Sequence, residues 1–82
     1  MELERIFAEL NEKPLPYRQF WSEVGRIRAE HLDEIPPEIS LDALLSILRT
    51  LQWISEQNGI VTLRTKSATQ PEILRAERAA FA

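Results

Sequence analysis

The chain has 82 residues, of which 44% are hydrophobic and 28% are charged, and it contains no cysteine. These values fit a single domain over residues 1–82, and they exclude a disulfide framework, a thiolate zinc site and a cysteine nucleophile. The formal net charge of -3 argues against generic attraction to nucleic-acid phosphates. No apolar run reaches the roughly 18 residues that span a membrane, and the acidic start does not fit a signal peptide. We therefore expect a cytoplasmic protein with no membrane contact.

The first apolar stripe predicts a helix from Glu2 to about Glu12. It consists of Leu3, Ile6, Phe7 and Leu10, which recur at the spacing of one helix face. Two prolines in the sequence KPLP, residues 13–16, end this helix before Pro14. They predict a short linker or a brief edge strand.

A second helix is expected to begin near Pro16 or Tyr17, where a proline fits the first turn. Its apolar residues form one broad aromatic face that we expect to join the core: Tyr17, Phe20, Trp21, Val24, Ile27 and His31. The segment 33–39 contains Pro36-Pro37 and is therefore predicted to be a loop, which Ile35 and Ile39 attach to the core.

The third helix is predicted to begin after Ser40, whose hydroxyl can cap the first turn, and to continue to Asn58-Gly59. Its leucines and isoleucines cover a wide arc, which indicates a central helix with more than one neighbour. On this reading Trp53 falls on the opposite, polar side. Residues 60–65 then read as a strand.

The tail, residues 68–82, has two interpretations. Thr69 and Glu72 have the spacing of a capping box, and the apolar residues after Pro71 keep helical spacing, which favours a short C-terminal helix. The alternative pairs residues 72–75 with residues 60–65 as the second strand of a β-hairpin.

This order of elements over residues 3–66 resembles the winged-helix variety of the helix-turn-helix fold, with the run LRTLQWISEQNGIVTLRT in place of the third helix and the first wing strand. The resemblance implies a mostly α fold, with a three-helix core followed by a strand or β-hairpin. It also implies DNA contact through the third helix. In this sequence, however, that helix offers only Arg49 as a cation, beside Asp42 and Glu56, and the loop before it is long and rich in proline.

Catalysis is not indicated. The chain has a single histidine, His31, and only two glycines, so the usual nucleophile and base pairs and a glycine-rich phosphate loop are missing from the sequence. No spacing of carboxylates matches a calcium loop. We therefore expect no catalytic residue, no cofactor and no metal.

Two hypotheses for function follow. The first is a small non-enzymatic adaptor or regulator that contacts another protein, or itself as a homodimer, through the polar side of the third helix. Its candidate residues are Trp53, Arg49, Thr50 and Gln57, because tryptophan is enriched in binding hot spots and arginine can stack on its ring. The burial of Trp53 under the wing or the tail is the alternative. The second hypothesis is a winged-helix DNA-binding regulator that uses Arg49, Arg64 and Lys66 for phosphate contact.

Overall fold

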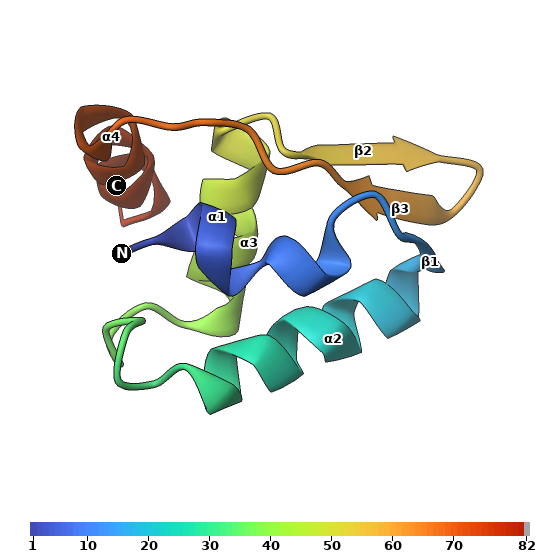
Figure 1. The fold of residues 1–82 in the computed structure, drawn as a ribbon, viewed down its shortest axis with the longest axis horizontal. Coiled ribbons are helices and arrows are strands. Elements are labelled where there is room, and N and C mark those ends of the chain that lie inside the picture. Colours follow the sequence, from blue (N-terminus) through green and yellow to red (C-terminus); the bar gives the residue numbers. More distant parts are fainter. Residues whose placement is uncertain (82) are drawn as a thin grey trace.

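The computed structural model describes residues 1–81 and combines helices with a small three-stranded antiparallel sheet. In chain order the elements are α1 (Leu3–Ile6), the 3-10 turn η1 (Ala8–Leu10), β1 (Pro14–Pro16), α2 (Tyr17–Glu30), α3 (Leu41–Thr50), β2 (Ile54–Gln57), β3 (Ile60–Leu63) and α4 (Gln70–Ala80). Figure 1 shows α3 in the middle, with α4 at one end of the molecule and the hairpin of β2 and β3 at the other. Ala82, the last residue of the predicted domain and of its tail, lies outside the described residues.

The N-terminal segment is helical over a shorter distance than its sequence predicts. The regular helix α1 ends at Ile6, and the chain tightens into η1, so the prediction of one helix from Glu2 to Glu12 is wrong. The tighter turn directs the chain toward the sheet, where the backbone N–H of Glu12 donates to the carbonyl of Leu63 at 2.7 Å. The predicted apolar stripe is confirmed, since all four of its side chains are at most 3% exposed.

The sheet has the strand order β1-β3-β2. The proline-bounded segment forms β1 at the edge of the sheet, which confirms the predicted edge strand and not the linker. Proline lacks a backbone donor and is tolerated at a sheet edge. In the observed register, Leu15 of β1 and Glu56 of β2 both lie opposite Val61 of β3.

The third helix is shorter than predicted, because α3 ends at Thr50 and not at Asn58-Gly59. Gln52 adopts a left-handed backbone with φ of 61°, and the chain then enters β2. Asn58 and Gly59 have φ angles of 53° and 78° and form the two-residue turn of the β2–β3 hairpin. Such a turn requires positive φ at both positions, which is the reason for the Asn-Gly pair.

The two helix caps that the sequence predicts are present. The Ser40 hydroxyl oxygen accepts from the backbone N–H of Ala43 at 3.1 Å. The Thr69 hydroxyl oxygen accepts from the N–H of Glu72 at 3.3 Å. Helix α4 follows this cap, which confirms the favoured interpretation of the tail. The alternative strand at residues 72–75 is wrong, because the neighbours of β3 in the sheet are β1 and β2.

The core lies between α3 and the elements around it. Four residues of α3, Leu44, Leu45, Ile47 and Leu48, are at most 4% exposed. The loop before α3 contributes Ile35 and Ile39, which are 0% and 2% exposed, as the sequence predicts. Within residues 1–81, no helix is both long enough and apolar enough to cross a membrane.

Candidate functional site

Arg49 lies on the exposed side of α3 and forms an ion pair with β2. Its Nη2 atom lies 3.0 Å from Oε1 of Glu56. Partial burial lowers the pKa of Arg49, but hydrogen bonding with Glu56 and then with Tyr17 outweighs this effect, so the pKa is raised above its ordinary value. The guanidinium is therefore held against β2 by Glu56.

Two aromatic side chains of α2 accompany this ion pair. The rings of Tyr17 and Trp21 have centroids 6.2 Å apart and are tilted by 40°. Tyr17 is 43% exposed and Trp21 is half-buried. The backbone N–H of Tyr17 donates to the carbonyl of Gly59 at 3.1 Å, which ties the start of α2 to the hairpin turn.

We name Tyr17, Trp21, Arg49 and Glu56 the aromatic–arginine patch. It joins α2, α3 and β2. The sequence predicts that Tyr17 and Trp21 belong to the core face of the second helix. This prediction is wrong for Tyr17, which is 43% exposed, whereas Trp21 is half-buried and packs against the edge of the core. Phe20, Val24 and Ile27 of that face are buried as predicted.

The sequence indicates that these two aromatic residues are less buried than Phe20, Val24 and Ile27 on the same helix. Trp21 lies at the edge of the predicted apolar arc, and Tyr17 is the first residue of its helix, where the core of a small domain ends. Arg49, which the sequence predicts to contact a partner, also belongs to the patch.

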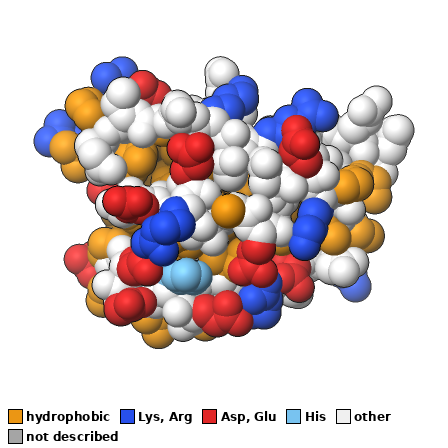
Figure 2. Space-filling view, viewed as in Figure 1, with side chains coloured by type: hydrophobic (Ala, Val, Ile, Leu, Met, Phe, Trp, Pro, Cys, Tyr) orange, Lys and Arg blue, Asp and Glu red, His pale blue; other side chains and the backbone are white. Residues whose placement is uncertain are grey.

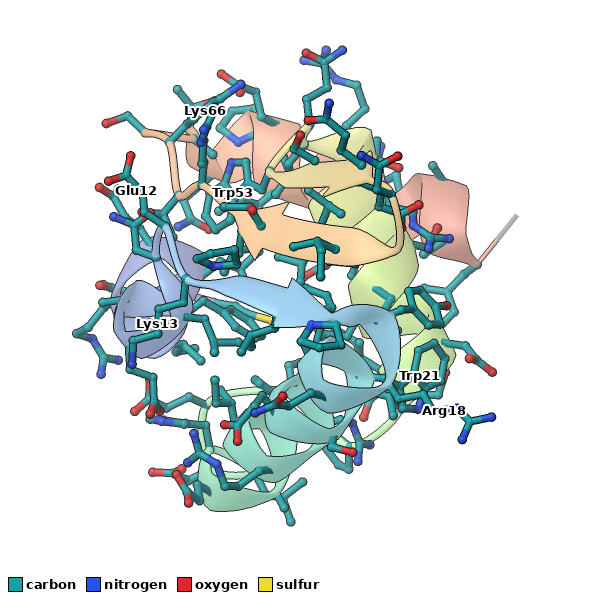
Figure 3. All side chains as sticks on the ribbon, turned by 90° about the vertical axis from the view of Figure 1, so that its right-hand side faces the viewer. Glu12, Lys13, Arg18, Trp21, Trp53 and Lys66 are labelled. Atoms are coloured by element: carbon teal, nitrogen blue, oxygen red, sulfur yellow. The ribbon has the colours of Figure 1, made fainter. Side chains whose placement is uncertain are left out.

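Trp53 lies in the core, so its predicted place on the polar side of a helix is wrong, and the alternative of a buried Trp53 is confirmed. It is 2% exposed, and it follows the end of α3 by three residues. Its backbone N–H donates to the carbonyl of Leu48 at 3.0 Å, and its own carbonyl accepts from the N–H of Arg64 at 2.8 Å. Figure 3 shows its side chain inside the upper part of the molecule, whereas Trp21 lies at the outer side of α2 beside Arg18. The helical spacing used for the prediction does not apply beyond Thr50.

The other two residues of the predicted partner surface lie apart from each other. Thr50 is exposed at the end of α3 and lines a groove that α4 borders with Arg75 and Ala79. Gln57 is exposed near the hairpin turn and lies opposite Ile60 in the sheet register. The structure therefore does not combine the predicted residues into one surface.

The three cations predicted to contact DNA are also separated. Alternate residues of a strand point to opposite faces of the sheet. Val61 and Leu63 are buried, so Arg64 points to the opposite face of the sheet. Glu56 lies opposite Val61 and shares its face, and Arg49 pairs with Glu56 there. Lys66 is exposed in the segment between β3 and α4.

Other titratable side chains form pairs at the surface of the molecule. Nδ1 of His31 lies 3.7 Å from Oε1 of Glu34, which is beyond hydrogen-bond distance. Arg26 is surrounded by Glu9, Glu23 and Glu30, and all of these side chains are substantially exposed. Over residues 1–81, histidine and carboxylate side chains do not gather in any group of three that could hold a metal ion.

The chain matches no protein-family model, no curated protein and no solved structure at a significant level.

Proposed function

We propose that this chain is a non-enzymatic, winged-helix-like module that works by contact with another protein. The order of elements supports the winged-helix part of the proposal. A strand lies between the first and second helices, and the β2–β3 hairpin directly follows α3, in the place of a wing. The apolar faces of α1, α2 and α3 would form the predicted three-helix core of a mostly α fold.

The aromatic–arginine patch is the observation that carries the protein-contact part. Trp, Tyr and Arg are the residue types most enriched in binding hot spots. Here the exposed Tyr17 lies against the half-buried Trp21, and the exposed Arg49 is paired with Glu56. The exposed ion pair of Arg49 with Glu56 contributes only about 0–1 kcal/mol to stability. Its stronger effect is to fix the guanidinium, which lowers the entropy lost when a partner binds.

DNA binding is the competing function, and three observations count against it. Glu56 neutralises Arg49, Arg64 projects from the other face of the sheet, and the chain has a net charge of -3. Phosphate contact needs cations that are free and clustered. We therefore favour a protein partner, which is either a different chain or a second copy of this one.

The test compares wild-type protein with Trp21→Ala and with the control Leu32→Ala. Leu32 is 51% exposed and lies outside the patch. Sedimentation over a wide concentration range measures self-association, and affinity capture from an extract of the source cells identifies other partners. We expect an association that Trp21→Ala abolishes and Leu32→Ala preserves. An association unaffected by Trp21→Ala would refute the proposal, and so would tight binding of duplex DNA that weakens steeply with salt.

A further inference from the structure

The two edges of the sheet differ in whether their backbone can pair with a further strand. In the order β1-β3-β2, strands β1 and β2 each have one outer edge. Along antiparallel strands, hydrogen-bonded pairs of residues alternate with pairs that are not hydrogen-bonded to each other. At an edge, the residues of the second kind of pair direct their backbone N–H and C=O groups outward. The observed hydrogen bonds therefore identify the outward residues of each edge.

The β1 edge is closed by proline. The N–H of Tyr17 donates to the carbonyl of Gly59 at 3.1 Å, which sets the alternation along this strand. In the observed register Leu15 then faces β3, while Pro14 and Pro16 face outward. Proline has no backbone N–H, so neither outward position of β1 can donate to another strand.

The β2 edge is open. The N–H of Arg64 donates to the carbonyl of Trp53 at 2.8 Å, so the alternation directs the backbone groups of Ile54 and Glu56 outward. Within residues 1–81 these outward groups have no hydrogen-bond partner. Figure 1 shows no other element beyond this side of β2. Natural edge strands are commonly guarded by proline, lysine or a bulge, and the sequence ISEQ with its regular register has none of these.

We propose that the open edge of β2 pairs with the same edge of a second copy of this chain. The two strands run antiparallel about a twofold axis at Ser55, which joins the two sheets into one. In this register Ile54 lies opposite the second copy's Glu56, and the two residues exchange both N–H···O=C bonds. A register centred on Glu56 would instead place two carboxylates opposite each other, which is destabilising.

The closed β1 edge makes the assembly stop at two copies. Pairing uses the open edge of each copy, and the outer edges of the joined sheet are the β1 strands with Pro14 and Pro16. A contact between identical surfaces about a twofold axis is closed in the same way. Strand β2 has four residues, so the shared edge is about 13 Å long at about 3.3 Å per residue. Such a short edge gives a dimer that depends on concentration, not a permanent one.

The charge distribution favours contact through this part of the chain. Residues 1–34 contain eight Asp and Glu against five Lys and Arg, a net charge of -3, while residues 35–82 contain five of each and are neutral. Figure 2 shows carboxylates gathered over α1 and α2 in the lower half of the molecule, with fewer along the upper margin where β2 lies. Two copies therefore meet with less repulsion at β2 than at α1 and α2.

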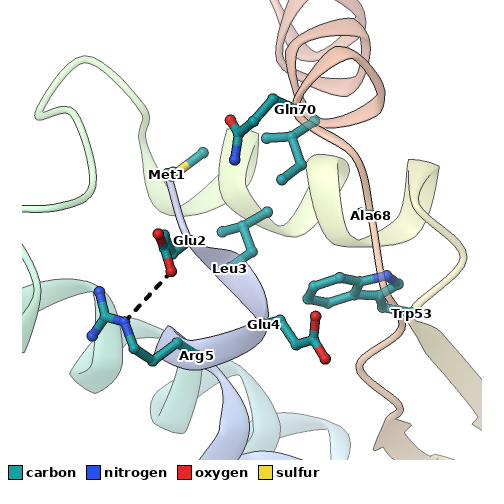
Figure 4. Close-up of a pocket in the computed structure, with 9 residues that line it drawn as sticks. Met1, Glu2, Leu3, Glu4, Arg5, Trp53, Ala68 and Gln70 are labelled. Carbon is teal, nitrogen blue, oxygen red and sulfur yellow. Dashed lines mark ion pairs between the residues drawn. The ribbon is translucent and has the colours of Figure 1, made fainter.

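The hollow beside Trp53 is a poorer seat for a second copy. It has a volume of about 250 Å³, but its apolar residues Leu3, Trp53 and Ile73 are at most 5% exposed. Figure 4 shows the charged side chains of Glu4 and Arg5 beside it. A copy seated there would gain little apolar contact and would remove charged groups from water. The outward groups of β2 are neutral amides that a second strand satisfies.

The inference rests on the proposed function, because it names a second copy as the protein partner. Glu56 belongs to both surfaces, since its side chain pairs with Arg49 in the aromatic–arginine patch and its backbone lies on the open edge. A copy that pairs with β2 therefore adjoins the patch.

Charged substitutions at Ser55 test the position of the twofold axis. Ser55 is exposed, and it would face its own counterpart across the axis. Ser55→Lys should therefore weaken dimerisation about fivefold, which corresponds to about 1 kcal/mol, and Ser55→Glu should do the same. An equimolar mixture of these two variants should dimerise at least as well as wild type, because opposite charges then meet. The control Ser67→Lys, in the exposed segment after β3, should behave like wild type.

Sedimentation over a wide concentration range measures these dimerisation constants. A wild type that stays monomeric at every concentration would refute the edge contact. Equal dimerisation by Ser55→Lys and Ser67→Lys would refute it too, and so would a mixture of the two Ser55 variants that dimerises no better than either variant alone.

Amide hydrogen exchange tests the backbone bonds themselves. Exchange at the N–H groups of Ile54 and Glu56 should slow as the protein concentration rises, while that of Lys66 should not change. Glu56→Pro removes one outward N–H, as proline does on β1, and should abolish dimerisation, whereas Glu56→Gln keeps this N–H and should retain it. Amide spectra verify folding, and if Glu56→Pro does not fold, the exchange and the Ser55 variants decide. Exchange at Ile54 and Glu56 that is independent of concentration would refute the pairing.

Failure of the edge is distinguishable from failure of the proposed function. Trp21→Ala tests the patch alone, because Trp21 lies on α2 and not in the sheet. If Trp21→Ala weakens an association that Ser55→Lys leaves unchanged, the edge is refuted and the patch stands. If Ser55→Lys weakens dimerisation and Trp21→Ala affects no association, the patch is refuted and the edge remains.

Discussion

Trp53→Ala should strongly destabilise the fold, whereas Trp21→Ala should not. Trp53 is 2% exposed, and its ring helps to fill the space between the start of α1 and the segment that leads to α4. Truncating a buried aromatic side chain typically costs about 3–5 kcal/mol, from lost transfer free energy and the cavity left behind. At about 0.05–0.15 kcal/mol per residue, a chain of 82 residues has a total stability of about 4–12 kcal/mol. The substitution should therefore remove a quarter or more of it.

Urea denaturation monitored by far-UV circular dichroism measures this difference directly. Trp21→Ala serves as the matched control and should lose about 1 kcal/mol or less, because Trp21 is half-buried at the surface. Trp53→Phe, which retains part of the buried aromatic volume, should fall between wild type and Trp53→Ala. A loss below about 1 kcal/mol for Trp53→Ala would show that the ring is not part of the core. Trp53 would then return as a candidate for partner contact.

Three further substitutions test separate parts of the structure. Leu48→Ala should cost about 2–5 kcal/mol in urea denaturation, since Leu48 is fully buried in α3, and a smaller loss would contradict its central place. Gly59→Ala should cost about 1 kcal/mol by the same assay. Its added Cβ would meet no atom within 4 Å, so only the φ of 78° opposes it, and an unchanged midpoint would contradict the turn. Hydrogen bonding to Arg5 lowers the pKa of Glu34. The stability gained is therefore present above the unfolded pKa and lost as pH falls through the folded pKa. Arg5→Ala should flatten this acid dependence in unfolding measured across the acidic range, and an unchanged slope would count against the pair.

Local signals predicted much of the fold. The hydroxyls of Ser40 and Thr69 cap α3 and α4, because each supplies an acceptor for a backbone N–H of the first helical turn. The start of α2 and the burial of Ile35 and Ile39 also follow from the positions of prolines and apolar residues. These features depend on neighbours in sequence, so the sequence alone was sufficient.

The candidate site was less predictable because it depends on where α3 ends. Helical spacing carried past Thr50 places Trp53 on a polar face, while the real chain turns at Gln52 and buries the ring. The Asn58-Gly59 pair fits a helix cap and also fits a two-residue hairpin turn. Only the pairing of residues 54–57 with 60–63 distinguishes the two, and that pairing is a non-local contact. The flanking β-branched residues were the available hint.

The aromatic–arginine patch depends on the β2–β3 hairpin. The hairpin turn accepts a hydrogen bond from the backbone N–H of Tyr17, and Glu56 on β2 pairs with Arg49. The pairing of β2 with β3 is therefore the non-local contact that brings residues of α2, α3 and β2 to one surface.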